Sequence, residues 1–246
     1  MTFNDHFSSL AATYRRFRPQ YPMELFDFLA SITPTKQRAW DCATGNGQAA
    51  VALANYFEKV TATDASEEQI KLAIAHDNVQ YEIATAENSE LDDQSQDLIT
   101  IANALHWFDI DPFFLEAQRV LKPKGVIAAW CYEAFQIDES VSDTFEVLYE
   151  DLKTFWPRQI KLVRDQYKTI DFPFEEIHTP NFQMKLEWDL NQCLGYMSSW
   201  SATQAYRKEL GKDPIEKHFD TICDAWGDHS LKRTVTWQVH IRVGRV

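Results

Sequence analysis

Glycine, cysteine and basic residues are all scarce in this chain of 246 residues, and these shortages exclude several classes of protein. The four cysteines have no Cys-x-x-Cys spacing, so they predict reduced thiols and neither a zinc site nor another metal site. Lys and Arg number 24 against 37 Asp and Glu, and the formal net charge of −13 argues against a nucleic-acid partner. We expect no membrane span, because no run of about 18 apolar residues occurs. The N-terminus lacks the apolar segment of a secretory signal, which predicts a cytoplasmic protein.

Aromatic residues are the one excess. The chain has 8 Trp, 9 Tyr and 16 Phe, and most of the tryptophans follow residue 124. Hydrophobic residues make up 45% and charged residues 25% of the chain, values typical of globular proteins. The length fits one large domain, or a core with a modest cap. We therefore expect a single globular domain whose second half is rich in aromatic side chains.

Short apolar segments alternate with helical patterns in the first half of the chain. The expected strands lie at 38–43, 59–63, 79–84, 97–103 and 126–130. One intervening helix starts at Ser66, with Gln69 three residues later as in a capping box. Regular alternation of strand and helix predicts an α/β fold with a doubly wound, Rossmann-like sheet that is mostly parallel.

The second half of the chain has a different pattern. Residues 140–170 and 191–229 have helical spacing, whereas 182–190 and 234–243 alternate apolar and polar side chains as strands do. The two alternating segments predict an antiparallel pair that closes the edge of the sheet. The expected single domain over 1–246 divides into an N-terminal helical lid (1–31), a cofactor-binding core (36–135), a helical substrate cap (136–178 and 191–231) and closing strands (179–190 and 232–246).

The segment DCATGNG at residues 41–47 follows the first expected strand. Gly45 and Gly47 allow a ligand to approach the backbone closely, at a strand-to-helix turn where free amides point outward. Asp64 ends the second strand, where a carboxylate can accept both hydroxyl groups of an adenosine ribose. Together the turn and the carboxylate predict a site for a nucleoside cofactor.

The same turn also satisfies the Gly-x-Gly-x-x-Ala pattern of dinucleotide sites, through Ala50. Three features favour a different cofactor. Asp41 ends the strand where dinucleotide enzymes usually carry an apolar residue, and the second half repeats no nucleotide-binding unit. In addition, NALHWF at 103–108 lies where a group transferred from the cofactor would project.

Several motifs, in the same order along the chain, resemble the class I S-adenosylmethionine-dependent methyltransferases. Within that class they are similar to the branch of trans-aconitate methyltransferase-like and type 11 domains. The matching pieces are the turn at 41–47 with Asp64, TAE at 85–87, NALHW at 103–107, LKPKG at 121–125, YRRFRPQYP at 14–22 and the tail from 226 to 245. Residues 136–225 match the family only in their general pattern of residue types.

The resemblance implies a cofactor role for each matching residue. It implies that the turn of Asp41, Ala43, Gly45 and Gly47 binds the methionine part of the cofactor and that Asp64 binds the ribose. It also implies that the adenine lies between Ala65 and Ala86, and that the amino acid end and the sulfonium lie near Asn103 and Leu105. Two positions depart from the family pattern. Ala43 replaces the glycine that often begins the turn, and Thr85 replaces an acidic residue that often faces the adenine amino group. That contact could pass to Glu87.

His106 is the best-placed candidate for a general base, because imidazole titrates near neutral pH. It could instead orient a neighbour or pack against Trp107, and a carboxylate acceptor would need no base. The candidate substrate contacts are Tyr14, Arg18 and Tyr21 in the lid, Trp107 after the fourth strand, and Trp130 and Tyr132 at the end of the fifth. Ordinary packing is the competing interpretation for each, and it is favoured for Trp188 and Trp237, which lie on the buried faces of alternating strands.

These patterns predict a methyltransferase that transfers a methyl group from S-adenosylmethionine to a small organic molecule, through a carboxylate or another oxygen nucleophile. A nicotinamide-dependent oxidoreductase and a non-catalytic cofactor-binding protein are the alternatives. RNA methylation ranks last, because the chain is acidic and lacks the motif of base methylases. The acceptor, the use of a base, the oligomeric state and any lid movement of 136–178 cannot be predicted from the sequence.

Overall fold

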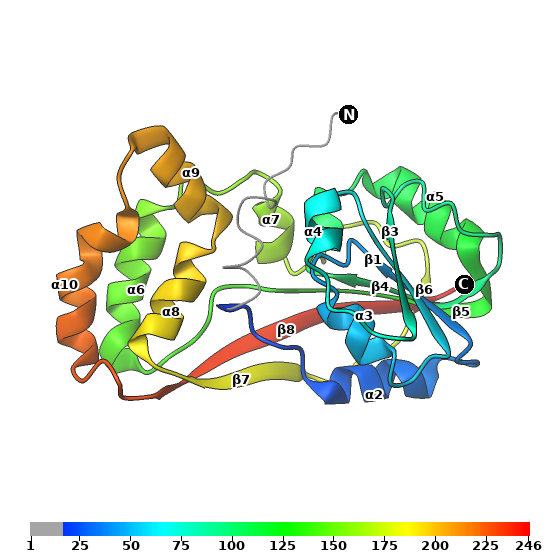
Figure 1. Ribbon diagram of the computed structural model, residues 1–246, viewed down its shortest axis with the longest axis horizontal. Helices are drawn as coiled ribbons and strands as arrows, with labels where there is room; N and C mark the ends of the chain where they lie inside the picture. The colour runs from blue at the N-terminus through cyan, green and yellow to red at the C-terminus, as the bar shows by residue number, and fades with distance from the viewer. Residues whose placement is uncertain (1–16) are drawn as a thin grey trace.

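The computed structural model describes residues 17–246, which form an elongated molecule with two unequal parts (Figure 1). Tyr14 and the rest of the expected lid before residue 17 lie outside the described residues. The described elements are α2 (Met23–Ile32), β1 (Arg38–Cys42), α3 (Gln48–Leu53), β2 (Lys59–Asp64), α4 (Glu67–Lys71), β3 (Val79–Ile83), β4 (Gln96–Ala102), the 3-10 helix η2 (Leu105–Trp107), α5 (Ile110–Val120), β5 (Leu121–Tyr132), α6 (Glu139–Asp151), α7 (Ile160–Arg164), β6 (Glu175–Glu176), β7 (Phe182–Trp188), α8 (Leu190–Ser198), α9 (Ser201–Leu210), α10 (Pro214–Trp226) and β8 (Arg233–Arg245).

A single sheet with the order β3-β2-β1-β4-β5-β8-β6 organises the core. The first five strands are parallel neighbours, as the alternation of strand and helix predicted. The chain moves outward from β1 to β3 and then crosses back, so that β4 and β5 lie on the other side of β1. This reversal confirms the doubly wound fold, and it opens a crevice for ligands at the carboxyl ends of β1 and β4.

β8 connects the two parts of the molecule. Its C-terminal half is antiparallel to β5, from Val239 opposite Tyr132 to Arg245 opposite Val126. Its N-terminal half is antiparallel to β7, and this two-stranded ribbon leads from the core sheet to the cap helices (Figure 1). The expected antiparallel closing strands are therefore present, and β8 pairs with both β5 and β7. The two-residue strand β6, which also pairs with β8, was not predicted.

Two hydrophobic clusters cover the two faces of the sheet, and β5 contributes to both. Val126, Ala128 and Trp130 belong to the cluster that includes α2 and α3, whereas Ile127 and Ala129 belong to the cluster that includes α5. Successive side chains of a strand point to opposite faces, so this division is what a strand buried on both sides requires. The cap helices extend the first cluster beyond the sheet.

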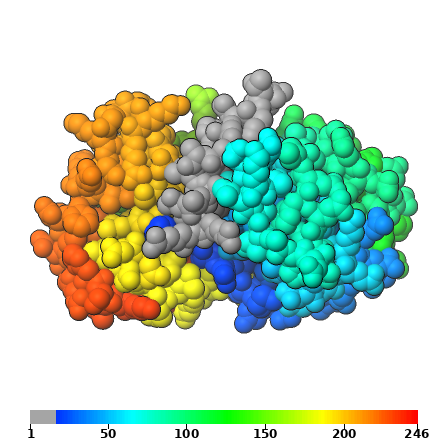
Figure 2. Space-filling view, in the orientation of Figure 1, coloured from blue at the N-terminus to red at the C-terminus, as the bar shows by residue number. Residues whose placement is uncertain are grey.

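The cap is built from α6, α8, α9 and α10 around aromatic side chains (Figure 1). Its yellow to red segments form the left end of the molecule in the space-filling view (Figure 2). Trp188 and Trp237 are buried there, with ring centroids 4.9 Å apart in an edge-to-face arrangement, so both are core residues as expected. The helical segment expected at 140–170 consists of two helices, α6 and α7. Turns separate them ahead of Pro157, which disfavours helical backbone at the residue before it. Among residues 17–246, no helix combines the length and apolarity needed to cross a bilayer.

Candidate functional site

The turn after β1 has left-handed backbone at every second residue. Ala43, Gly45 and Gly47 have φ angles of 54°, 56° and 84°. A Cβ atom on Gly47 would lie 2.1 Å from Tyr81 Oη, so glycine is required there by both the backbone and its neighbour. A Cβ atom on Gly45 would have Gln69 Oε1, 3.9 Å away, as its nearest described neighbour. Among the described residues, Gly45 therefore leaves space above the turn for a ligand.

Asp64 joins this turn to the loop that follows β2. One carboxylate oxygen accepts a hydrogen bond from the N–H of Gly45 at 2.9 Å, and the other accepts from the N–H of Ser66 at 2.8 Å. Ser66 caps α4 by accepting from the N–H of Gln69, as the capping pattern predicted. The half-buried carboxylate thus lies beside the space above Gly45, with Ala65 next to it.

Asp41 is a buried carboxylate beneath the turn. It accepts hydrogen bonds from the hydroxyl groups of Thr44 at 2.5 Å and Thr100 at 2.7 Å. Burial outweighs these bonds and raises the pKa of Asp41 to about 6. A positive charge bound nearby would favour the ionised form, so this carboxylate suits a ligand with a cationic group.

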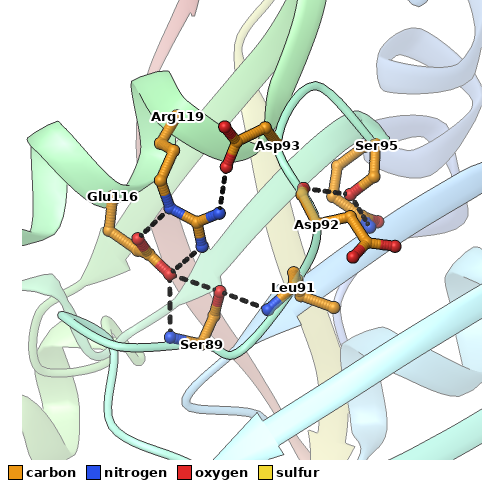
Figure 3. A network of polar contacts seen from close by, with 8 residues as sticks. Ser89, Leu91, Asp92, Asp93, Ser95, Glu116 and Arg119 are labelled. Atoms are coloured by element: carbon orange, nitrogen blue, oxygen red, sulfur yellow. Dashed lines mark hydrogen bonds and ion pairs between the residues drawn. The ribbon is translucent and has the colours of Figure 1, made fainter.

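A side-chain network fixes the loop after β3, which carries Ala86 (Figure 3). Ser89 donates both its N–H and its hydroxyl group to Glu116 of α5, at 2.8 and 2.6 Å, and Arg119 of the same helix also binds Glu116. Burial alone would raise the pKa of Glu116, but the hydrogen bonds from Arg119 and Ser89 lower it to about 2. The ionised carboxylate therefore anchors the chain three residues after Ala86.

A cavity of about 90 Å³ lies between the carboxyl ends of β4 and β5 and the cap. Its lining includes Asn103, His106, Trp107 and Tyr132 from the core and Tyr149, Trp156, Tyr196 and Trp200 from the cap. Arg18, Arg164 and Glu133 are the charged residues in the described lining. The described lining therefore holds two arginines and one glutamate, in a chain of net charge −13.

His106 lies on the core side of this cavity and is 5% exposed. Its Nδ1 is 2.9 Å from the hydroxyl oxygen of Tyr167, and its ring packs against Trp107 with centroids 4.8 Å apart. Burial lowers the pKa of His106 to about 3, so the imidazole is neutral at physiological pH. A ring this weakly basic is poorly matched to general base catalysis, and the geometry suits an orienting role better.

Comparison with known proteins identifies the family. The family model described as a methyltransferase domain, of type 11, matches residues 40–129, which include the turn and Asp64. A Dictyostelium discoideum protein provisionally named a methyltransferase is 34% identical over 239 residues, covering 93% of this chain and 90% of that protein. The chain belongs to the class I methyltransferases.

Two further similarities bear on this methyltransferase. A solved structure from Anaeromyxobacter dehalogenans, provisionally described as a type II methyltransferase, has a TM-score of 0.87 at 39% identity and covers 93% of this chain and 98% of that one. A Saccharomyces cerevisiae protein provisionally named an S-adenosylmethionine-dependent methyltransferase is 27% identical over 138 residues, or 52% of this chain and 47% of that protein. These similarities do not confirm the trans-aconitate methyltransferase branch.

The methyltransferase fold brings the predicted cofactor residues to one edge of the sheet, at the ends of β1 to β4. Asn103 has a φ angle of 54°, and its N–H donates to the carbonyl oxygen of Trp130 at 3.0 Å. Its side-chain Oδ1 is buried and has no hydrogen-bond partner among residues 17–246. Leu105 is buried, and Glu87 accepts from the N–H of Asp109 at 3.0 Å. The cofactor contacts of these residues stay predictions.

The predicted substrate residues fall into two groups. Arg18 donates to the hydroxyl oxygen of Tyr132 at 3.3 Å, and both line the cavity together with Trp107. Trp130, by contrast, is fully buried and is not in the described lining, so its expected place in the pocket is corrected to the core. The reason is that Tyr21 and Phe26 cover its indole, with ring centroids 5.3 and 6.2 Å from that of Trp130.

Sequence reasoning missed the cap side of the cavity and the partner of His106. Tyr149, Trp156, Tyr196 and Trp200 belong to the aromatic excess after residue 124, but nothing in their spacing showed which aromatics would reach the cavity. Tyr167 lies in a turn after α7, and it is distant in sequence from His106, so only the folded chain brings the two side chains together. The unusual density of aromatics was the one available signal.

Proposed function

We propose that this methyltransferase transfers the methyl group of S-adenosylmethionine to a small organic molecule, through a carboxylate or another oxygen nucleophile of the acceptor. The observation that carries the proposal is the position of the aromatic cavity. It begins at Asn103 and His106, at the end of β4, beside the turn that would hold the cofactor. In an open α/β sheet this crevice is where ligands bind.

Four features of the chain fit the cofactor. The space above Gly45 admits a ligand against the backbone, and Asp64 lies beside it, ready to accept from ribose hydroxyl groups. Buried Asp41 suits the ammonium group of the methionine part, and the buried Oδ1 of Asn103, at the end of β4, offers a further acceptor. The name of the Saccharomyces cerevisiae relative supports the same cofactor.

The charges and rings of the cavity support an anionic acceptor. The guanidinium of Arg18 lies over the ring of Tyr196, 5.1 Å from its centroid, and that of Arg164 lies 5.7 Å from the centroid of Tyr149. Each guanidinium also donates to a tyrosine hydroxyl group, Arg18 to Tyr132 and Arg164 to Tyr149, so both are held at the cavity, and a guanidinium matches the geometry of a carboxylate. The aromatic walls would bury the rest of a small acceptor and exclude water from the reacting atoms.

Bound S-adenosylmethionine would supply an activated methyl group, and the protein's residues would align the acceptor with it. Holding two reactants in line is a proximity effect that can lower a barrier by about 7–11 kcal/mol. Arg18 and Arg164 would hold the anionic group, while Trp107 and the cap aromatics would fix the plane of the acceptor. We do not propose nucleic acid as an acceptor, because a chain with a net charge of −13 repels the phosphate backbone.

Isothermal titration of the full chain with S-adenosylhomocysteine and, separately, with NADPH tests the cofactor. We expect micromolar binding of S-adenosylhomocysteine that Asp64→Ala abolishes and that Asp27→Ala preserves, since Asp27 is an exposed residue bonded to Tyr56. Binding of NADPH alone would instead favour the nicotinamide-dependent oxidoreductase. Binding of S-adenosylhomocysteine without turnover on any acceptor would favour a non-catalytic cofactor-binding protein.

An acceptor screen with methyl-labelled S-adenosylmethionine tests the substrate class. Benzoate, cinnamate and succinate would each be compared with the corresponding alcohol. Methyl esters release labelled methanol in mild base whereas ethers do not, so the chemistry of the product is read directly. We expect base-labile label from at least one acid, and label transferred only to alcohols would contradict the carboxylate assignment.

A further inference from the structure

Tyr167 reaches from the turn after α7 to the short helix η2, and it is fully buried. Its hydroxyl oxygen is 2.9 Å from Nδ1 of His106, and this hydroxyl group has no second hydrogen-bond partner among residues 17–246. A buried hydroxyl proton needs an acceptor, and Nδ1 is the acceptor within reach among the described residues, so we take the hydroxyl group to donate to Nδ1. A neutral imidazole carries a single ring proton, which then belongs on Nε2.

The backbone around Tyr167 is strained and held in place. Gln166 and Tyr167 have φ angles of 57° and 58°, two successive left-handed residues without a glycine. Arg242 of β8 donates to the carbonyl oxygen of Tyr167 at 3.0 Å and to that of Ile170 at 2.7 Å. Strained backbone of this kind persists only where many surrounding contacts hold it in place, and it is concentrated at functional sites. The result is a hydroxyl group fixed against the ring of His106.

The other charged groups around His106 do not replace Tyr167 as its partner. Arg18, Arg164 and Glu133 line the same cavity, and the Glu133 carboxylate lies 3.7 Å from Nε2 of His240. Burial raises the pKa of Tyr167 well above its ordinary range, so this hydroxyl keeps its proton at physiological pH. Since Nδ1 is occupied by Tyr167 and the ring lines the cavity, Nε2 is the nitrogen that can meet a ligand.

We propose that Tyr167 is a positioning residue that fixes His106 as a hydrogen-bond donor, through Nε2–H, to one oxygen of the acceptor carboxylate, so that the other oxygen receives the methyl group. This inference rests on the proposed function and narrows it. A donor at that point selects an acceptor that is already anionic, such as a carboxylate, rather than a hydroxyl group that must first lose its proton to a base.

The chemistry balances without a base. An oxygen lone pair of the carboxylate forms the O–CH₃ bond while the S–CH₃ bond breaks, and the bonding electrons stay on sulfur. The anionic carboxylate and the cationic sulfonium become a neutral ester and a neutral thioether, and no proton moves. The Nε2–H of His106 would bind one oxygen of the carboxylate and direct the other toward the methyl group. An alcohol acceptor would require a proton sink, which a neutral, donating His106 does not provide.

Nitrogen NMR of the full chain with labelled histidine, bound to S-adenosylhomocysteine, tests the tautomer directly. His106→Gln identifies the His106 signals by their loss. We expect an unprotonated Nδ1 and a protonated Nε2, unchanged between pH 8 and pH 5. A proton on Nδ1, or on both nitrogens at pH 7, would overturn the proposal. The wild-type spectrum decides this even if Tyr167→Phe does not fold.

Matched tyrosine variants test the positioning. Tyr167→Phe removes only the hydroxyl group, and we expect a mixture of the two neutral tautomers at His106. Tyr149→Phe makes the same change in the same cavity without touching His106, and we expect the wild-type tautomer. A Tyr167→Phe protein with the unchanged single tautomer would show that the hydroxyl group does not set the ring.

Two substitutions of His106 separate a donor from a base in the assay with whichever acid the acceptor screen identifies. Glutamine places an amide N–H₂ near the position of Nε2, and leucine fills the space without a donor. We expect His106→Leu to lose kcat/KM by roughly 10- to 100-fold, the loss typical of one hydrogen bond to a charged group, and His106→Gln to recover most of it. Equal losses in both variants would refute the donor role. A chain that binds no S-adenosylhomocysteine would refute the proposed function instead, whatever the tautomer.

Discussion

Three glycine-to-alanine substitutions separate the two tasks of the turn after β1. Gly45, Gly47 and Gly211 all have left-handed backbone, with φ angles of 56°, 84° and 64°. Forcing an alanine into this region costs about 1–2 kcal/mol. Gly211 ends α9 with no described atom within 4 Å of its would-be Cβ, so Gly211→Ala measures the backbone cost alone.

Gly47→Ala adds a collision with Tyr81 to that cost. The new Cβ would lie 2.1 Å from the Tyr81 hydroxyl oxygen, which must move and thereby lose its hydrogen bond to the carbonyl of Ile74 at 2.7 Å. A lost hydrogen bond of this kind costs about 0.5–1.5 kcal/mol. We expect Gly47→Ala to lose about 1 kcal/mol more stability than Gly211→Ala, or roughly 2–4 °C in melting temperature for a chain of this length.

Gly45→Ala should behave in the opposite way. Its Cβ would enter the space assigned to the cofactor, so we expect a stability close to that of Gly211→Ala and an affinity for S-adenosylhomocysteine reduced by about 10- to 100-fold, the cost of overpacking by one methyl group. Urea unfolding and isothermal titration measure the two quantities on the same samples. Wild-type affinity in Gly45→Ala would refute the placement of the cofactor, and equal stability of Gly47→Ala and Gly211→Ala would refute the Tyr81 argument.

Three further substitutions test the electrostatics and capping around the turn. Asp41→Asn should stabilise the fold by about 1–3 kcal/mol at pH 8 but not at pH 4. The raised pKa of Asp41 means that the wild-type protein loses stability as the pH rises through about 6 and the buried carboxylate ionises. Urea unfolding at pH 8 and at pH 4 checks this. Glu116→Gln should destabilise the fold at pH 7, with the deficit shrinking as pH falls from 4.5 toward 2, because the depressed pKa of Glu116 contributes stability only while it is ionised; an equal deficit at pH 3 would contradict it. Ser66→Ala should cost about 1 kcal/mol in thermal unfolding, against little change in Asp109→Ala, whose side chain forms no cap bond in α5.

Much of the core could be predicted because its signals are local. Strands at 38–43, 59–63 and 126–130 were visible as apolar runs between turns, and the Ser66 cap depends on residues three positions apart. The crevice at the carboxyl ends of β1 and β4 then follows from topology, since right-handed crossovers leave few arrangements for alternating strands and helices. The turn at 41–47 could be placed in this crevice from the sequence alone.

What could not be predicted depends on contacts between distant segments. The periodicity of β5 shows that Trp130 and Cys131 point to opposite faces, but not which residues of a face are covered by other elements. Trp130 belongs to the cluster under α2, while the next residue on its face, Tyr132, reaches the cavity. Tyr167 is harder still, because it meets His106 across 61 residues and through a turn with no glycine to mark it.

The cavity depends on both parts of the molecule, and this explains why the acceptor is harder to predict than the cofactor. The turn and Asp64 are held within the core sheet, which the family pattern describes. The acceptor walls, by contrast, come from the core through Tyr132 and from the cap through Tyr196, and Arg18 contacts both side chains. Since the β7–β8 ribbon connects the cap to the core sheet, a small change in that ribbon would move the cap walls relative to the strand ends without altering the turn. A common cofactor site with acceptors that differ between relatives is the expected consequence.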